Sequence, residues 1–337
     1  MTGVASSQKH LVIRSSIRFV SIAVLFTVMS VPTLLHASPP QTSAAPQVTK
    51  IEPPNWWIGL TSETLFLLSG HDLEATHVSC NLPTLRVMRT QATAGGDYLF
   101  VWLKIGASTR SGTAICRVTT PNGPTSFELP LAARAATQGT FQGPLTNEIP
   151  SPDESDLRSV RERLPQLKKM RTTLLRLAPL AMRDADSVSA DHGVVDFYSV
   201  DPRRGTLQDL QEVVTSVHDQ QIKVVLDLEL IHISSHHPWV TKPPLAEWLG
   251  APLGGLGAHS QHLPPVPSSG RIPDTENPLV ALYLLQNAIW WTESSGVDEI
   301  RVTSDPNATS EFWASWRAEL KKIYPHLTII RDSPHLE

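Results

Sequence analysis

Three closely spaced histidines, His232, His236 and His237, are the first candidates for a site that does chemistry. Imidazole nitrogens bind zinc and other transition metals, but a protein metal site needs further ligands at suitable spacing. No carboxylate stands at metal-ligand spacing to complete a set around these histidines. We therefore predict no metal and no other cofactor.

Two pairs of adjacent tryptophans could stack on sugars, because flat apolar rings suit the CH faces of pyranoses. Trp290 and Trp291 lie at helical spacing with neighbouring aliphatic residues, which favours core packing. Trp56 and Trp57 follow a Pro-Pro step and precede a glycine. For this second pair, an inter-domain contact and a ligand contact both stay open.

Cys80 and Cys116 are the two cysteines of the chain, too few for a disulfide framework. In an oxidising compartment they could bridge two strands, closing a loop of about 36 residues and stabilising by roughly 2 to 4 kcal/mol. The alternative is two separate buried thiols that act as small apolar residues. Neither interpretation makes them catalytic.

The composition excludes several classes of protein. The chain has 337 residues, 41% of them hydrophobic, which is too apolar for a disordered chain. Its 28 Lys and Arg against 32 Asp and Glu give a net charge of -4, so we predict no nucleic-acid partner held by charge. The length indicates roughly two domains.

The first 37 residues have the pattern of a secretory signal. Residues 1–18 are basic with no acidic residue, residues 19–35 are apolar, and Ala37 precedes a polar, proline-rich segment. A retained membrane anchor is the alternative, but Pro32 and the marginal length of the run argue against a stable span. We expect cleavage after Ala37, no membrane span afterwards, and an exported protein that is periplasmic or secreted.

The organisation of the remaining chain changes at two predicted linkers, residues 38–48 and 135–152. Residues 49–134 contain six or seven short β-type runs separated by turn residues, which predicts an immunoglobulin-like β-sandwich. Residues 153–337 alternate helical patterns with buried-strand runs, which predicts parallel βαβ units. About four parallel strands are expected, at residues 172–180, 223–230, 299–304 and 327–333.

Several longer motifs resemble a known family. Residues 51–59 (IEPPNWWIG) and 98–101 (YLFV) are similar to the N-terminal sandwich of cyclomaltodextrinases and neopullulanase-like enzymes. The following part resembles the α-amylase barrel of glycoside hydrolase family 13, in the segments His192-Gly193, DFY (196–198), VDPR (200–203), GTL (205–207), HPW (237–239), ENPLV (276–280) and QNAIWW (286–291). The fold implied is a β-sandwich followed by a TIM-barrel-derived α/β domain.

The resemblance also implies a sugar site, and assigns His192, Asp227, His232 and Arg301 to substrate binding. The family pattern Asp-x-x-x-Asn-His is present as residues 227–232, with Ile231 in place of the asparagine. We expect Asp227 and Arg301 to form a structural ion pair. The implied ligand is an α-glucan or maltodextrin.

The catalytic positions depart from the family pattern. A retaining glycosidase needs a nucleophile and an acid/base carboxyl about 5 to 5.5 Å apart. The nucleophile position carries Thr303, and two residues of strand would move Asp305 about 6.6 Å away from it. The acid/base position carries Asp332, one methylene shorter than glutamate, after Arg331 where the family has glycine.

The barrel also looks incomplete. About 185 residues follow the second linker, where a complete barrel typically needs about 250. The first barrel strand is expected to be missing, because residues 135–152 contain no apolar run, and the last conserved region is expected to be missing as well. Four parallel strands would leave two edges for a homodimer or another partner to cover.

Three functional hypotheses follow. The first is a catalytically impaired or inactive relative that at most binds α-glucan, so that ordinary hydrolysis is absent or residual. The second is a glycoside hydrolase active on α-1,4-glucans through an altered site that uses Asp332. The third is a decayed fragment that acts only as an interaction module.

Overall fold

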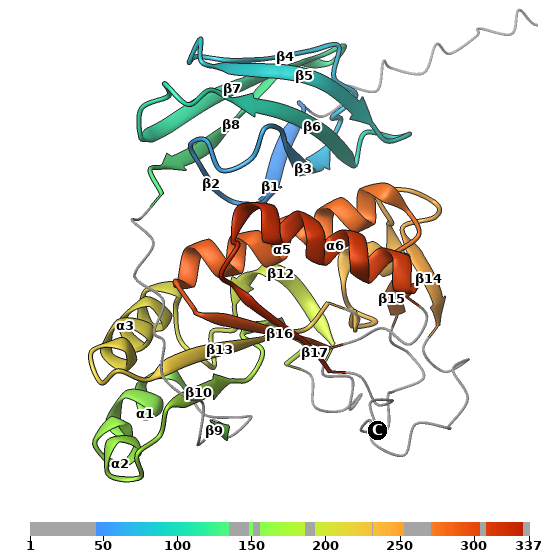
Figure 1. Cartoon of the computed structure of the whole chain (residues 1–337). Coiled ribbons are helices and arrows are strands. Elements are labelled where there is room, and N and C mark those ends of the chain that lie inside the picture. The colour runs from blue at the N-terminus through green and yellow to red at the C-terminus, as the bar shows by residue number, and fades with distance from the viewer. Residues whose placement is uncertain are drawn as a thin grey trace, which may run out of the picture. The chain divides into compact units, whose positions relative to one another are not determined.

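The computed structural model describes residues 45–134, 148–150, 156–185, 193–230, 232–252, 271–303 and 308–332. The predicted β-sandwich is confirmed: strands β1 to β8 form two four-stranded sheets (Figure 1). The first sheet, antiparallel throughout, has the order β1 (Gln47–Glu52), β3 (Thr64–His71), β6 (Tyr98–Ile105), β5 (Leu85–Ala92). The second has the order β2 (Trp56–Trp57), β8 (Gly123–Ala132), β7 (Gly112–Thr120), β4 (His77–Cys80), with β2 parallel to β8.

Burial along the strands explains their sequence patterns. In β7 alternate side chains are buried, as in a strand with one face to solvent. In β6 nearly every side chain is buried, because its second face is covered by the α/β region, where Phe100 packs against Trp248 with ring centroids 5.7 Å apart. This double burial accounts for the continuous apolar run in β6.

Two strands of the sandwich were not predicted. β1 begins at Gln47, inside the range expected to be a linker, and β2 is a two-residue strand at Trp56–Trp57. β1 is an edge strand with only Glu52 fully buried, so it has no run of large apolar residues to mark it. The predicted linker of residues 38–48 therefore ends before Gln47.

The second part contains the predicted parallel sheet. Its four longer strands are all parallel and were all predicted: β10 (Leu174–Leu177), β13 (Lys223–Leu228), β16 (Glu299–Thr303) and β17 (Thr328–Asp332). A fifth, β9 (Glu148–Pro150), pairs in parallel with β10 at the opposite end of the sheet from β17. β9 stands where the first strand was expected to be missing, so that prediction is wrong. The strand was overlooked because its three residues include only one aliphatic residue and so form no apolar run.

The helices follow the predicted alternation. They are α1 (Leu157–Glu162), α2 (Leu164–Lys169), α3 (Leu207–His218), α5 (Pro278–Ser295) and α6 (Ser310–Ile323). The predicted helix over residues 155–170 is split in two, because Pro165 has no N–H to bond the carbonyl four residues earlier. Thr206 and Asp209 form a capping box at the start of α3, and α5 ends at Gly296 in the left-handed conformation.

Short elements occupy the connections between these strands. β11 (Ala181–Arg183) pairs antiparallel with β12 (Val194–Val200), and β14 (Leu249–Pro252) pairs antiparallel with β15 (Arg271–Pro273). α4 (Pro238–Thr241) is a single helical turn between β13 and β14.

The helix α5 joins the sandwich to the α/β region (Figure 1). The side-chain amide of Gln286 accepts from Leu65 N at 2.8 Å and donates to Leu65 O at 2.7 Å. Trp290 donates from its indole to Asn55 Oδ1 at 2.9 Å. Among the helices that the structure describes, α5 included, none is both long and apolar enough to cross a membrane.

Candidate functional site

Asp227 lies near the C-terminal end of β13, beside its register partner Arg301 on β16. The predicted ion pair between them is confirmed: Arg301 Nε lies 3.2 Å from Oδ1, and Nη2 donates to Oδ2 at 3.2 Å. Arg176 on β10 was not predicted and brings its Nε within 3.4 Å of the same Oδ2. The Asp227 carboxylate therefore lies between two guanidinium groups, each about a quarter exposed.

The two positions that the resemblance assigns to nucleophile and acid/base are neighbours in this sheet. β16 and β17 pair in parallel so that Thr303 stands directly beside Asp332. Residues two apart in a strand share a face, so Thr303 follows Arg301 toward the strand end where barrel active sites are built. The side chains of Thr303 and Asp332 lie outside the described residues, as do His192 and Ile231 altogether.

The three histidines do not converge on one point. His236 Nδ1 lies 2.6 Å from the buried carboxylate of Asp184, which also accepts from Ser234 Oγ at 2.7 Å. His237 is buried, and its Nδ1 accepts from Trp239 N at 3.1 Å. His232 is half-buried beside the bridge between β12 and Ile233. Within the described ranges, no group of three or more His, Cys, Asp or Glu side chains is placed to hold a metal.

Burial determines the charge state of His237. It lowers the pKa of the imidazole to about 3, and the nearby Lys50 ammonium adds to the effect. His237 is therefore neutral at physiological pH, in agreement with Nδ1 acting as an acceptor.

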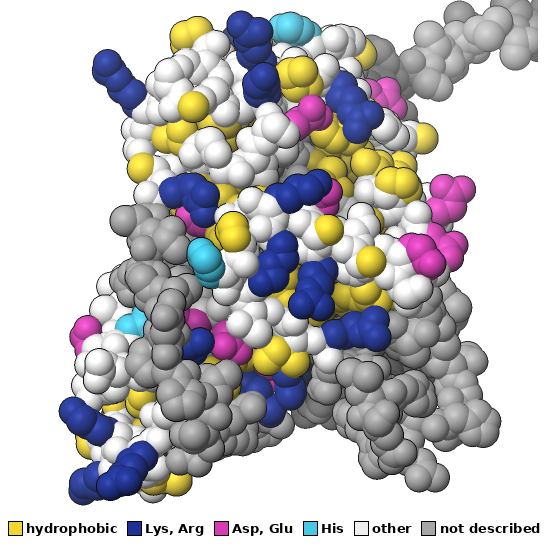
Figure 2. Space-filling model, viewed as in Figure 1, with side chains coloured by type: hydrophobic (Ala, Val, Ile, Leu, Met, Phe, Trp, Pro, Cys, Tyr) yellow, Lys and Arg dark blue, Asp and Glu magenta, His cyan; other side chains and the backbone are white. Residues whose placement is uncertain are grey.

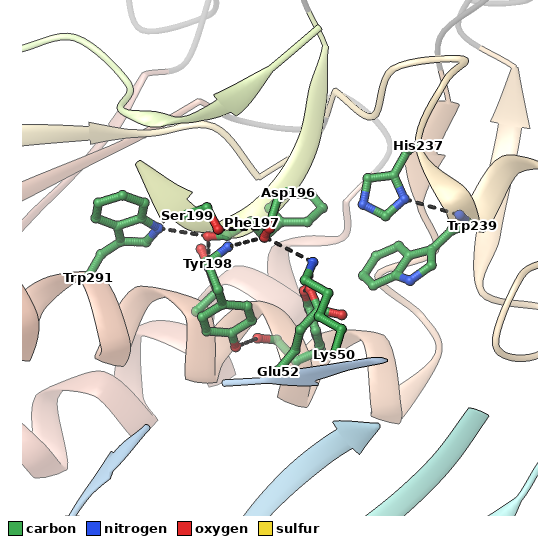
Figure 3. A network of polar contacts seen from close by, with 11 residues as sticks. Lys50, Glu52, Asp196, Phe197, Tyr198, Ser199, His237, Trp239 and Trp291 are labelled. Carbon is green, nitrogen blue, oxygen red and sulfur yellow. Dashed lines mark hydrogen bonds and ion pairs between the residues drawn. The ribbon is translucent and has the colours of Figure 1, made fainter. Parts of the chain in front are cut away.

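A further polar network, which the sequence did not suggest, lies where β1 meets β12 and α5 (Figure 3). Lys50 Nζ lies 2.9 Å from Glu52 Oε1 and 3.0 Å from Asp196 Oδ1. Tyr283 donates its hydroxyl to the same Glu52 oxygen at 2.9 Å. Asp196 also accepts from the backbone N–H of Tyr198 at 2.9 Å. One ammonium thus links carboxylates from the sandwich and from the α/β region.

The electrostatics of this network follow from burial. Glu52 is only 2% exposed, and burial raises the pKa of its carboxyl, although the Lys50 ammonium opposes the shift. Burial disfavours the charged form of Lys50, but the carboxylates of Glu52 and Asp196 outweigh it and raise its pKa. Burial also raises the pKa of Tyr283 well above its ordinary value, so this phenol stays a hydrogen-bond donor.

A cleft of about 700 Å³ opens beside this network, between β1, β8 and β12. Its walls include Lys50, Phe127, Glu128, Asp196, Tyr198 and Ser199. Tyr198 and Phe127 are each 4% exposed, so neither offers a flat face for a sugar ring. Lys50 and Asp196 already pair with each other, so these two groups join elements rather than supply a nucleophile or a general acid.

The tryptophan pairs are packing residues in this structure. Trp290 and Trp291 are each 2% exposed, which agrees with the predicted core role, and Trp291 donates to Phe197 O at 3.0 Å. Trp56 and Trp57 are also buried, at 0% and 7% exposed. No open ring face is available for the sugar stacking considered for Trp56 and Trp57, which favours packing within the sandwich.

Cys80 and Cys116 form a disulfide between β4 and β7, where the two residues are register partners. Of the two alternatives left open by the sequence, the bridge is the one that the structure contains. The bond joins strands within one sheet of the sandwich and lies away from the charged residues of the parallel sheet.

One of the residues that the sequence analysis missed carries a recognisable signal. Arg176 is a charged residue within the apolar run that becomes β10, whereas Lys50 and Glu52 lie in β1, which has no apolar run. A charged side chain within a buried-strand run requires a partner of opposite charge. That rule would have flagged Arg176, but it could not have named Asp227 as its partner.

The described residues form a β-sandwich joined to parallel βαβ units, with ionisable residues at the carboxyl ends of the strands, which is where barrel proteins of this architecture build their sites. Residues 50–135 match the family described as cyclomaltodextrinase, N-terminal. Residues 124–244 match the α-amylase catalytic domain. The chain belongs to the α-amylase family, glycoside hydrolase family 13, with the N-terminal domain of cyclomaltodextrinases and neopullulanases, and the catalytic domain covers only part of it.

The chain is also similar to individual proteins over part of their length. The chain is 28% identical over 202 residues to alpha-amylase 3 of Dictyoglomus thermophilum, covering 52% of this chain and 39% of that protein. It is 24% identical over 198 residues to a cyclomaltodextrinase of a Bacillus species, covering 53% and 34%. The crystal structure of the Geobacillus thermoleovorans α-amylase complexed with acarbose aligns with a TM-score of 0.45 at 25% identity, covering 53% and 40%. The matched region thus spans well under half of each relative.

Proposed function

We propose that this protein is an exported member of the α-amylase family that binds α-glucan and hydrolyses it weakly or not at all. The observation that carries the proposal is Thr303 at the nucleophile position, in register beside Asp332. Retaining glycosidases form a glycosyl-enzyme on a carboxylate. Loss of a covalent nucleophile from a concerted site costs on the order of 10⁴ to 10⁶ in rate.

Sugar binding needs less than sugar cleavage. It requires hydrogen-bonding groups at the strand ends, and Arg301 and Asp227 hold each other there. The resemblance adds His192 and His232 to this set. Because Asp227 is neutralised by Arg176 as well as Arg301, its role is to fix the two guanidinium groups rather than to act as a free acid.

Titration calorimetry with maltoheptaose, combined with chromatography of the products, tests the proposal. We expect binding without cleavage. We expect Arg301→Ala to weaken binding about tenfold or more, as for loss of a charge-assisted hydrogen bond. A matched control, Arg86→Ala on the exposed face of β5, should bind like the parent. Absence of binding would remove the α-glucan proposal.

Hydrolysis through an altered site is the second candidate. It is favoured by the backbone register, because Asp332 keeps a carboxyl group beside the position of the lost nucleophile. In that case Asp332→Ala would abolish turnover of cyclodextrin or pullulan, and Asp332→Glu would retain or raise it. Turnover that survives Asp332→Ala would reject this role for Asp332.

An interaction module is the third candidate. Among the described strands, β9 and β17 are the outermost of the parallel sheet, and Ile330 on β17 is 37% exposed. Unpaired strand edges favour association with a homodimer partner or another chain. Light scattering tests this point: a dimer would support it, and a monomer that resists protease would count against obligatory pairing.

Export is supported by two features of different kinds. Residues 1–37, which lie outside the described residues, have the composition of a secretory signal. The Cys80–Cys116 disulfide suits an oxidising compartment such as the periplasm or the exterior. Cell fractionation, with N-terminal sequencing of the exported form, should find a protein that begins at Ser38.

A further inference from the structure

Glu229 is a second carboxylate near the end of β13. It follows Leu228, the last residue of the strand, and lies two residues after Asp227. β13 pairs in parallel with β16, with Asp227 beside Arg301. Two further steps along this register bring Glu229 beside Thr303, which the resemblance assigns to the nucleophile position. A carboxylate therefore stands on the strand next to the one that has lost it.

The Glu229 carboxylate is mostly buried but only half satisfied. Figure 2 shows acidic side chains scattered over the surface in view, where water solvates them, whereas only 13% of the Glu229 side chain is exposed. Its Oε2 lies 3.4 Å from Nη2 of Arg183, at the end of β11. Its Oε1 is buried and accepts no hydrogen bond from any residue that the structure describes. A buried oxygen of this kind takes its donor from water or from a ligand.

A structural ion pair is the alternative role of Glu229. A good structural pair lies nearby, where Arg203 contacts both oxygens of Asp201, at 2.9 Å from Nε and 2.6 Å from Nη2. The pair of Glu229 with Arg183 has one contact, longer than the usual length of about 2.7 to 2.9 Å. Nε of Arg183 is buried without a partner among the described residues. A buried pair with unsatisfied atoms on both sides contributes little to stability, so it does not account for Glu229.

The spacing of the carboxyl positions determines which hydrolysis they could perform. Thr303 stands beside Glu229 on one side and beside Asp332 of β17 on the other. Glu229 and Asp332 are therefore two strand spacings apart, about 10 Å in the backbone. Retaining glycosidases hold their two carboxyl groups about 5 to 5.5 Å apart, whereas inverting ones hold them about 6.5 to 9.5 Å apart, with a water between. The backbone spacing is close to that of the inverting arrangement.

We propose that Glu229 is a general base that gives this protein slow hydrolysis of α-glucans with inversion at the anomeric carbon. This role rests on the proposed function, because α-glucan must bind at the strand ends. Glu229 takes a proton from a water molecule while the water oxygen bonds to the anomeric carbon. The bond from that carbon to the glycosidic oxygen breaks, and the acid form of Asp332 gives its proton to the leaving oxygen. Proton exchange with solvent then restores both carboxyl groups.

The anomer of the first product tests this role on the parent protein. α-Maltosyl fluoride is the probe, because fluoride leaves without a proton donor and slow turnover becomes measurable above a blank without protein. We expect NMR spectra recorded before mutarotation to show β-maltose, and α-maltose as the first product would overturn the proposal. A parent that binds maltoheptaose but does not turn over the fluoride would overturn it and leave the proposed function intact. Loss of binding as well would remove both.

Variants of Glu229 identify the base. Glu229→Gln should lower kcat on the fluoride at least about 100-fold and change KM by less than about threefold. Azide should restore turnover of Glu229→Ala by forming β-maltosyl azide, because an anionic nucleophile needs no base, whereas a purely structural role gives no rescue. The matched control Glu63→Gln, at an exposed position of the sandwich, should behave like the parent.

The outcome is decisive even if these substitutions disturb folding. Circular dichroism shows whether each Glu229 variant is folded, and the product anomer of the parent decides the question if neither is. An unchanged kcat in folded Glu229→Gln would overturn the proposal. Failure of azide to form β-maltosyl azide with folded Glu229→Ala would overturn it as well.

Discussion

Gln286 offers a sensitive test of how α5 holds the sandwich. The pairing of β1 with β3 ends at Leu67 of β3. Leu65, two residues before it on β3, therefore has no residue of β1 beside its N–H and C=O groups. The Gln286 amide satisfies both groups, at 2.8 and 2.7 Å, in place of a neighbouring strand. Gln286 is 2% exposed, so no water can replace it without rearrangement. The amide therefore acts as a one-residue extension of the sheet.

The expected cost of Gln286→Leu follows from these two bonds. Each buried backbone group left without a partner costs about 1 to 3 kcal/mol, and burial of the leucine side chain offsets part of the sum. We expect a net loss of about 3 kcal/mol in the free energy of unfolding. At about 2 to 4 °C per kcal/mol for a domain of this size, the melting temperature should fall by about 6 to 12 °C.

Urea unfolding followed by tryptophan fluorescence measures this loss. Gln208→Leu is the matched control, because Gln208 is exposed on α3 and the same substitution there should change stability by less than about 0.5 kcal/mol. Gln286→Glu adds a second check: its carboxylate would face the Leu65 carbonyl, so the damage should be greater at pH 7 than at low pH. A Gln286→Leu protein as stable as the parent would refute the reasoning.

Three further predictions concern buried charge and the disulfide. The pKa of His237 is lowered from 6.5 to about 3 in the folded protein, so between these two pH values the unfolded chain binds one proton more than the folded chain. Stability should therefore decrease as the pH decreases, by about 2 kcal/mol from pH 7 to pH 5. His237→Asn, which keeps an acceptor, should remove this part of the pH dependence of unfolding, and an unchanged slope would contradict the assignment. Asp227→Asn leaves Arg301 without its carboxylate partner and should lower the free energy of unfolding in urea by about 2 to 3 kcal/mol. This is less than for a fully buried pair, because the guanidinium groups are partly exposed. An unchanged free energy of unfolding would show that solvent screens the charges. Replacing Cys80 and Cys116 by alanine should cost about 2 to 4 kcal/mol, and a reductant should lower the melting temperature of the parent but not of this variant.

The fold could be predicted where burial produces a strong period. The apolar runs at β10, β13, β16 and β17 and the helical patterns at α3, α5 and α6 all correspond to observed elements. β2 and β9 were missed because two or three residues are too few to show a period, and β1 was missed because only one of its six residues is fully buried. The split between α1 and α2 was missed because the period alone does not register the lost hydrogen bond of Pro165.

The polar sites were harder to predict, because their partners are distant in sequence. Asp227 and Arg301 were paired only through the resemblance to a family, since 74 residues separate them. Tyr283 and Glu52 are 231 residues apart, and nothing local marks either residue as a partner of the other. Local patterns thus locate a buried charge, and only the tertiary structure identifies what neutralises it.

The distribution of buried charges bears on whether this chain is a decayed fragment. Sequence decay has no preference for position, so it should leave carboxylates in the core without cations. Instead Glu52 is paired with Lys50, and Glu299, 2% exposed, lies 3.5 Å from Lys223. The departures from the family pattern stand at Ile231, Thr303, Arg331 and Asp332, at or beside the positions that the resemblance assigns to the sugar site, while these structural pairs are complete. A protein that folds, whatever chemistry it retains, accounts for both observations, whereas decay accounts only for the departures.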